Sequence, residues 1–461
     1  MSMKVLKLYM MMLIVGMCCS CDEYLEVKNY GQVLPETDED YATLINNQLS
    51  AIDKGTAGAA NMLGSFAWMI ELECYSDNLN TSLMTSNTLS YIYVGTNVNS
   101  AQYRFMNYYS LIKDYNIIID NLKERDTELG KKILATAYAM RGVMYFNLMR
   151  ECCEAYEKDR ATEIMGVPNV EHFDIEAKPG RGNIQELVNF IVRDLETAIQ
   201  MNQTDEQYRF TADVARAYLA RTYFWAQDWK NAIKMAKEVL DKYPLVDGDE
   251  YKEMIQSPQG KLGDMLFRTF ITGSLTAYNR NLKNVKTRPV NMSLINLFPE
   301  KERDIRYTTF FDSKYFSTKG IRVCVRAAEM CLILAESYAH LSDTDNALTY
   351  LNLLRSKRIA DYVPYTVATL PAVDESDVIK TDATGAKLTP LMSAVLNERR
   401  KEMFMEGDRW FELKRNGSPE FWVGYNFVKY TTEKYLYTFP LRKADLIANE
   451  NLVQNPGYEN L

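Results

Sequence analysis

Apolar side chains recur at helical spacing over two adjoining stretches of the chain. From Tyr103 to Leu122 they fall three or four residues apart, and Ile133 to Met149 continues in the same way. This spacing places the apolar side chains on one face of each helix. The pattern therefore predicts a helix pair near residues 103–150.

Two later stretches repeat one arrangement at an offset of 115 residues. Each has a leucine followed at once by alanine, then a tyrosine and a second alanine, in the order of a tetratricopeptide repeat (TPR), whose small residues let paired helices approach closely. We expect TPR-like pairs near 210–243 and 322–358, although an ordinary α-hairpin would show part of this pattern. The matched positions are Leu219, Ala220, Tyr223 and Ala232, with Pro244 after them, and Leu334, Ala335, Tyr338 and Ala347.

The segments between these pairs differ in character. Residues 80–99 are rich in Asn, Ser and Thr, residues 257–319 carry Gly, Asn, Arg and scattered aromatics, and residues 363–390 are polar. They predict loops and short strands inserted into a helical frame, and loops on a rigid scaffold commonly carry binding sites. Because no Pro/Gly/Ser linker divides the chain, we expect one unit over 21–461. The predicted fold is mainly α, with TPR-like helix pairs forming a curved frame and a loop-rich second lobe packed on it.

The first twenty residues have the composition of a targeting segment. Lys4 and Lys7 precede an apolar run from Leu8 to Met17 that is too short to span a bilayer. Ser20-Cys21 then leads into acidic residues, which resembles a bacterial lipoprotein signal with Cys21 as the first mature residue. A lipidated Cys21 would hold the chain at a membrane by its lipid anchor only. An ordinary secretory signal with free cysteines is the alternative.

Composition excludes several functions. A formal net charge of −8 argues against nucleic acid as a partner, because phosphates require an excess of Lys and Arg. Five cysteines remain after the signal, an odd number, and their spacing suits buried apolar side chains better than disulfides or a metal site. Gly180-Arg181-Gly182 lacks the third glycine of a dinucleotide site. We find no catalytic motif, no metal site and no cofactor site.

The run from 397 to 415 predicts a charged helix that ends in aromatic anchors. Glu398, Glu402 and Glu406 recur at i+4 among arginines, so opposite charges lie within one turn of each other. We interpret these charges as ion pairs that hold the C-terminal helix to the frame. The run resembles the C-terminal signature of the SusD/RagB family of surface lipoproteins. Similar agreement is found at 21–27, 437–440 and 449–458.

The resemblance implies a function. SusD/RagB proteins are outer-membrane, cell-surface lipoproteins that capture oligomeric nutrients above a SusC-like TonB-dependent transporter. By this resemblance we expect a non-catalytic protein that binds an oligosaccharide and delivers it to that transporter. An oligopeptide ligand is an alternative, because the chain has only five tryptophans. A TPR-type protein-interaction adaptor is the other.

Candidate ligand-binding residues follow from position. The family binds ligands on inserted loops, which in this chain are the segment after Asn78 and the insert between the two repeats. Aromatic rings stack on sugar C–H faces, while amide and guanidinium groups bond sugar hydroxyls. A solvated strand face is the alternative for the two tyrosines spaced i, i+2. The candidates are Asn80, Tyr91, Tyr93, Tyr278 and Arg280.

Overall fold

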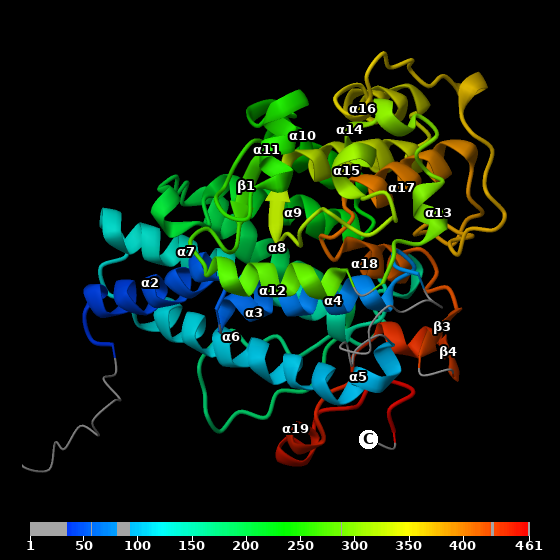
Figure 1. Cartoon of the computed structure of the whole chain (residues 1–461). Coiled ribbons are helices and arrows are strands. Elements are labelled where there is room, and N and C mark those ends of the chain that lie inside the picture. The colour runs from blue at the N-terminus through cyan, green and yellow to red at the C-terminus, as the bar shows by residue number, and fades with distance from the viewer. Residues whose placement is uncertain (1–34, 57, 81–92, 287, 426–427, 460–461) are drawn as a thin grey trace, which may run out of the picture.

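Helices dominate the chain and pack against one another largely in sequence order (Figure 1). The structure is a computed structural model, and it describes residues 35–56, 58–80, 93–286, 288–425 and 428–459. Each helix of the frame packs on the next, and α10 brings the first repeat against α15 of the second. The frame consists of α6 (Tyr103–Asn121), α7 (Glu128–Cys152), α8 (Ile184–Gln200), α9 (Ala212–Trp225), α10 (Trp229–Lys242), α15 (Ala327–His340), α16 (Thr344–Ser356) and α17 (Pro390–Glu402).

The turns of the two repeats have the same conformation, and not only their helices match. Gln227 and Ser342 both take positive φ, 56° and 59°. The aspartate that follows each of them, Asp228 or Asp343, accepts a hydrogen bond from the backbone three residues later and caps the second helix of its pair. The offset of 115 residues therefore extends through the whole turn, and the mainly α, TPR-like fold is confirmed.

The second lobe is more helical than its sequence suggested. We expected loops and short strands over 257–319, but three helices lie there (α12 to α14). Short helices of this kind depend on tertiary packing more than on propensity, so their periodicity is weak. The lobe and its connections contain α2 (Asp38–Lys54), α3 (Ala59–Gly64), α4 (Phe66–Tyr75), α5 (Val94–Ala101), α11 (Gly248–Gln256), β1 (Met265–Arg268), α12 (Leu275–Val285), α13 (Met292–Ile295), α14 (Ile305–Phe310), β2 (Cys324–Arg326), α18 (Asp408–Arg415), β3 (Phe421–Tyr425), β4 (Val428–Thr432) and α19 (Lys443–Ala448).

The strands form two small antiparallel sheets. β1 pairs with β2, with a shift of register between Met265 and Phe267, and β3 pairs with β4 as a hairpin. Five free cysteines lie in the described chain, and all but the half-buried Cys324 are buried, as their spacing predicted. No helix in the described ranges is long and apolar enough to cross a membrane.

The charged run at 397–415 is two helices, not the single helix we expected. α17 ends at Glu402, and α18 begins at Asp408 after Met405 and Gly407 have taken positive φ. The positive φ of Gly407 favours glycine at this turn, and a Cβ there would also displace the end of the Met69 side chain, whose sulfur would lie 2.4 Å away. Glu406 therefore sits in the turn rather than on a helix face.

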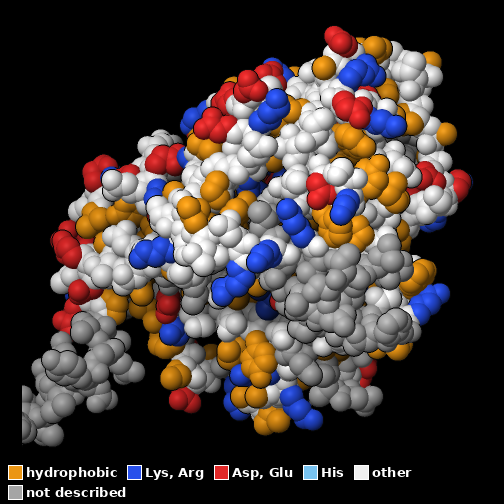
Figure 2. Space-filling model, viewed as in Figure 1, with side chains coloured by type: hydrophobic (Ala, Val, Ile, Leu, Met, Phe, Trp, Pro, Cys, Tyr) orange, Lys and Arg blue, Asp and Glu red, His pale blue; other side chains and the backbone are white. Residues whose placement is uncertain are grey.

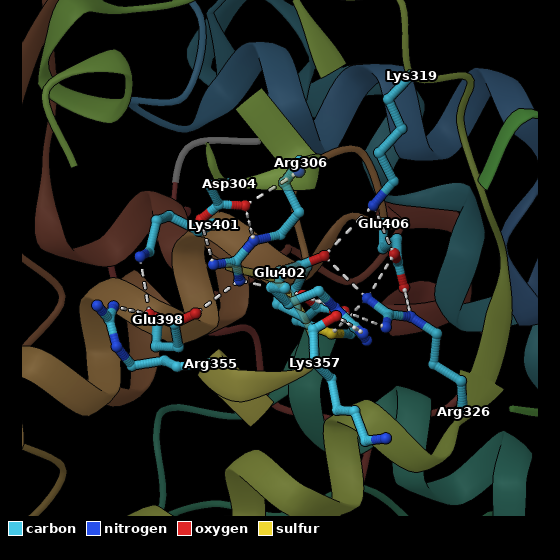
Figure 3. Close-up of polar contacts among 12 residues, drawn as sticks. Asp304, Arg306, Lys319, Arg326, Arg355, Lys357, Glu398, Lys401, Glu402 and Glu406 are labelled. Carbon is cyan, nitrogen blue, oxygen red and sulfur yellow. Dashed lines mark hydrogen bonds and ion pairs between the residues drawn. The ribbon is translucent and has the colours of Figure 1, made fainter. Parts of the chain in front are cut away.

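The charges of this run form a buried network, as we interpreted them (Figure 3). Glu402 lies at its centre and pairs with Arg326 at 2.6 Å, with Arg358 at 3.0 Å and with Arg306 at 3.1 Å. Glu398 pairs with Arg306, Arg355 and Lys401, and Glu406 pairs with Arg326 and Lys319. The network joins the signature to elements of the second repeat and of the second lobe.

The C-terminal tail covers the end of α7. A helix leaves its last carbonyls without partners, and here residues distant in sequence supply the donors. Lys414 Nζ donates to the carbonyls of Arg150 and Cys153, and Phe439 N donates to Glu151 O at 2.8 Å. The carbonyl of Cys152 accepts from the side chains of Arg181 and Asn455. Hydrogen bonds from Phe439 and Asn455 therefore hold the tail against the end of α7, a helix of the frame.

Candidate ligand-binding site

The β3–β4 hairpin has one inward and one outward face. Val423 pairs with Tyr430, and Trp422 pairs with Thr431, so the two pairs point to opposite sides. Val423 is fully buried, whereas Trp422 is 44% exposed. The hairpin therefore turns its tryptophan toward solvent.

Trp422 differs from the other tryptophans of the chain, all of which are described. Trp68, Trp225 and Trp410 are buried, and Trp229 stacks on His340 with ring centroids 4.0 Å apart. Among the described side chains, the ammonium of Lys429 lies beside the Trp422 ring, 5.1 Å from the ring centroid. An exposed indole with a neighbouring cation is a surface that can stack on a ligand and donate to it.

Tyr93 supports this hairpin from the start of α5. Its hydroxyl donates to Thr431 O at 2.7 Å, and its ring stacks on Tyr430 with centroids 4.9 Å apart. Burial of the ring raises the pKa of Tyr93 to about 12. Tyr91, the other tyrosine of the predicted pair, lies outside the described residues.

Asn80 reaches the same region through the backbone. Its N–H donates to Pro289 O at 2.8 Å, next to an isolated bridge between Leu79 and Val290. Arg288, one residue earlier, donates to Gly424 O in the hairpin at 3.3 Å. The structure thus connects Asn80 to the hairpin that Tyr93 supports.

Tyr278 and Arg280 lie on α12 but face different environments. Tyr278 is 8% exposed, and its ring packs against Phe66 and Phe270 in the core. Because the ring is enclosed by these neighbours, we do not retain Tyr278 in the candidate site. Arg280 is exposed, and Figure 2 shows Lys and Arg side chains gathered over α12.

A cavity of about 930 Å³ opens at the base of the hairpin. Gly417 and Ser418, just before β3, line it, and so do Lys434 and Tyr435, just after β4. The two ends of the hairpin thus lie at the cavity. The volume of the cavity lies in the range of small-ligand sites. Loops 154–160 and 382–385 complete the wall.

Gln227, in the turn between α9 and α10, holds two loops of the cavity wall by hydrogen bonds. Gln227 donates from Nε2 to the carbonyls of Tyr156 and Ala383, at 3.1 and 2.6 Å. Asp382 accepts from the backbone of Thr384 and Ala386 and so shapes its own loop. The wall offers aromatic rings, carboxylates, amides and ammonium groups. Among the described residues, no cluster of His, Cys, Asp and Glu could hold a metal ion.

Sequence reasoning missed the hairpin. The run from Phe421 to Tyr430 carries aromatic side chains around Gly424 within ten residues, which is a signal for a short aromatic-rich hairpin. The sequence analysis instead placed the ligand site on the loop after Asn78 and on the insert between the two repeats. Of the predicted residues, Tyr93 contacts the hairpin directly, and Asn80 bonds Pro289, the residue after Arg288, which bonds the hairpin.

Comparison with known proteins identifies the family. Residues 123–458 match the SusD family, and the chain belongs to it. Among curated proteins, no sequence matches significantly.

Solved structures of the family share the fold. A SusD superfamily protein from Bacteroides vulgatus has a TM-score of 0.70 at 19% identity, covering 92% of this chain and 100% of that one. A SusD superfamily protein from Bacteroides thetaiotaomicron has a TM-score of 0.69 at 19% identity, covering 91% and 100%. A SusD-like carbohydrate binding protein from Bacteroides vulgatus has a TM-score of 0.66 at 18% identity, covering 91% and 98%.

Proposed function

We propose that this protein binds an extracellular oligosaccharide on the hairpin and in the cavity at its base, without catalysing a reaction. The observation that carries the proposal is the exposed Trp422 on a hairpin whose two ends line a cavity of about 930 Å³. Indole stacking suits the C–H face of a sugar ring, and the polar cavity wall suits its hydroxyls. Membership in a family that includes a structure described as carbohydrate binding supports the choice of ligand.

Delivery to a transporter is the second part of the proposal. The captured oligosaccharide would pass to a SusC-like TonB-dependent transporter in the outer membrane, with this protein held at the cell surface by a lipid on Cys21. Support comes from the family and from the lipoprotein-like sequence before Asp22. Of the other predicted residues, Asn80, Tyr91, Tyr93 and Arg280 would flank the bound ligand.

Trp422→Ala should weaken oligosaccharide binding. Loss of an aromatic anchor costs about 1–3 kcal/mol, which corresponds to roughly 5- to 150-fold in affinity. Isothermal titration calorimetry of the purified protein with an oligosaccharide pool, then with a mixed peptide pool, measures this. Phe173→Ala is the matched control, because that ring is 47% exposed and lies in the loop between α7 and α8.

Three results are informative here. Heat with sugars that falls in Trp422→Ala but not in Phe173→Ala supports the proposal. Equal affinity in both variants removes the hairpin from the site. Heat with peptides alone means that the ligand is an oligopeptide and the sugar proposal is wrong.

Cys21→Ser should release the protein from membranes. In this proposal a single lipid on Cys21 provides the attachment, and none of the described helices could span the membrane in its place. Fractionation of cells that lack the transporter, followed by immunoblotting, reports the change. Retention of Cys21→Ser in the membrane fraction would refute the anchor.

A further inference from the structure

Residues 265–299 contain several basic side chains and no acidic one. This composition contrasts with the formal net charge of −8 for the whole chain. Two of the cations, Arg268 and Arg288, are buried. The others are exposed and lie on α12 or directly after its last residue; they are Arg280, Lys283 and Lys286. The exposed charge of this stretch is therefore concentrated on one surface helix.

These three exposed cations form a row, which we call the α12 row. They are spaced three residues apart, which places them on neighbouring turns of a helix. Lys286 N donates to Lys283 O at 3.1 Å, so the last turn of α12 continues to Lys286. With a rise of about 1.5 Å per residue, the row is about 9 Å long. A row of this length can contact anionic groups on neighbouring units of one extended ligand.

The charges of the α12 row are not matched by acids of the protein. None of its side chains forms an ion pair or a hydrogen bond with another described residue. Figure 2 shows Lys and Arg side chains gathered over α12, while most Asp and Glu side chains of this face lie at the left and upper edges. Like charges without counter-ions repel one another, so anionic groups that approach the row stabilise it.

A second helix with exposed lysines shows the contrast. On α10, Lys230, Lys234 and Lys237 are exposed, but they share that helix with Glu238 and Asp241. Mixed charges of this kind are typical of a solvated helix face. The single sign of the α12 row instead favours an anionic partner.

The α12 row ends beside the β3–β4 hairpin. Lys286 and Arg288 are two residues apart, which separates their Cα atoms by at most about 7 Å. Arg288 donates to Gly424 O in β3 at 3.3 Å. Lys429, whose ammonium lies near the Trp422 ring, is opposite Gly424 in β4. Figure 1 shows α12 across the front of the molecule, between α2 and the side that carries β3 and β4.

We propose that the captured oligosaccharide is acidic and that the α12 row binds its carboxylate or sulfate groups. This inference rests on the proposed function and specifies the class of its ligand. One end of the oligosaccharide stacks on Trp422, and the chain continues along α12. The guanidinium of Arg280 can hold a carboxylate or a sulfate through two parallel hydrogen bonds, while the two lysines act as point charges.

An anionic membrane surface would also attract a row of cations. The position of the row favours the sugar, because the row ends at the hairpin whose exposed Trp422 suits a sugar ring. Anionic vesicles therefore serve as a separate arm of the test.

Calorimetry of the purified full chain with matched sugars tests the proposal. The probes are an oligogalacturonate hexasaccharide, its methyl ester, which has the same sugar units without the charge, and a chondroitin sulfate hexasaccharide, which adds sulfates. At least one acidic probe should bind about tenfold or more tightly than the methyl ester. Raising NaCl from about 0.1 M to about 1 M shortens the Debye length from about 10 Å to about 3 Å and should remove most of this preference.

Charge-removing variants test the location. Arg280→Gln, Lys283→Gln and Lys286→Gln combined should weaken binding of the acidic probe about tenfold, since each exposed charge pair contributes a few-fold. Lys230→Gln, Lys234→Gln and Lys237→Gln combined are the matched control, which removes the same charge from α10 and should leave binding unchanged. All six positions are exposed, so both variants should keep the circular dichroism spectrum of the unmodified protein.

Each other outcome overturns the proposal. Binding of the methyl ester as tightly as both acidic probes means that the ligand is neutral. Equal affinity for the acidic probe in the two triple variants means that the α12 row does not bind it. Attachment to phosphatidylglycerol vesicles that is lost in the α12 variant, without binding of either acidic probe, means that the row contacts a membrane.

The two proposals fail in different ways. Unchanged affinity in Trp422→Ala, together with weaker binding in the α12 variant, would remove the hairpin from the site and leave the α12 row in it. The reverse result would keep the hairpin as the binding site and contradict the acidic ligand on α12.

Discussion

Glu402→Gln is expected to destabilise the folded protein by about 3–5 kcal/mol, the usual cost of leaving buried charges without a partner. Glu402 is fully buried and pairs with three arginines, Arg306, Arg326 and Arg358 (Figure 3). Glutamine has nearly the same shape but no charge, so three guanidinium groups lose their shared counter-ion. The loss of stability therefore comes from the missing charge and not from a cavity in the packing.

Urea denaturation followed by circular dichroism measures this change. Glu375→Gln is the matched control, because Glu375 pairs with Lys387 at 3.6 Å with both side chains largely exposed. Exposed pairs contribute about 0–1 kcal/mol, so the control should unfold nearly as the unmodified protein does. Equal midpoints for the two variants would mean that the buried network contributes little to stability.

A stability maximum at weakly acidic pH is the second large effect that we expect. Neighbouring cations hold the pKa of Glu406 and of Glu336 at about 2, against an ordinary value of 4.5. Each depression corresponds to about 3 kcal/mol of stability. This stability is present above pH 4.5 and is lost as the pH falls toward 2. Glu402, whose pKa is held well below its ordinary value by Arg358, Arg326 and Arg306 against the cost of burial, adds to the loss.

Other buried acids act in the opposite direction at higher pH. Burial raises the pKa of Glu73 and of Glu412 to about 7. Their contribution is complete below pH 4.5 and declines as the pH rises through 7. Stability therefore falls both below about pH 4.5 and toward pH 7, and its maximum is expected near pH 5. Thermal unfolding from pH 3 to 8 checks this, and a melting temperature that keeps rising from pH 5 down to pH 3 would contradict it.

The repeat helices could be predicted because their signal is local. Leu219 and Ala220 recur as Leu334 and Ala335 at one offset, and small residues at a close helix contact can only be replaced at a cost in packing. The charged signature was predicted to form ion pairs, which it does. Its break at Gly407 was missed, because the i+4 charge pattern continues through the turn and conceals it.

The site was harder to predict because it depends on how distant segments meet. Tyr278 looked like a loop aromatic, yet α12 turns its ring against Phe66, a contact across more than two hundred residues that no local pattern reveals. Tyr93 was proposed as a ligand contact, and the structure shows it supporting Tyr430.

The covering of α7 by the tail bears on how the chain reaches its fold. Asn455 contacts Cys152 across 303 residues, so the end of a central helix stays open until almost the whole chain is available. Contacts of such long range close late and slow the search for the native state. A polypeptide leaving the ribosome would therefore remain incompletely folded at the end of α7, and accessible to chaperones and proteases there, until Asn455 emerges.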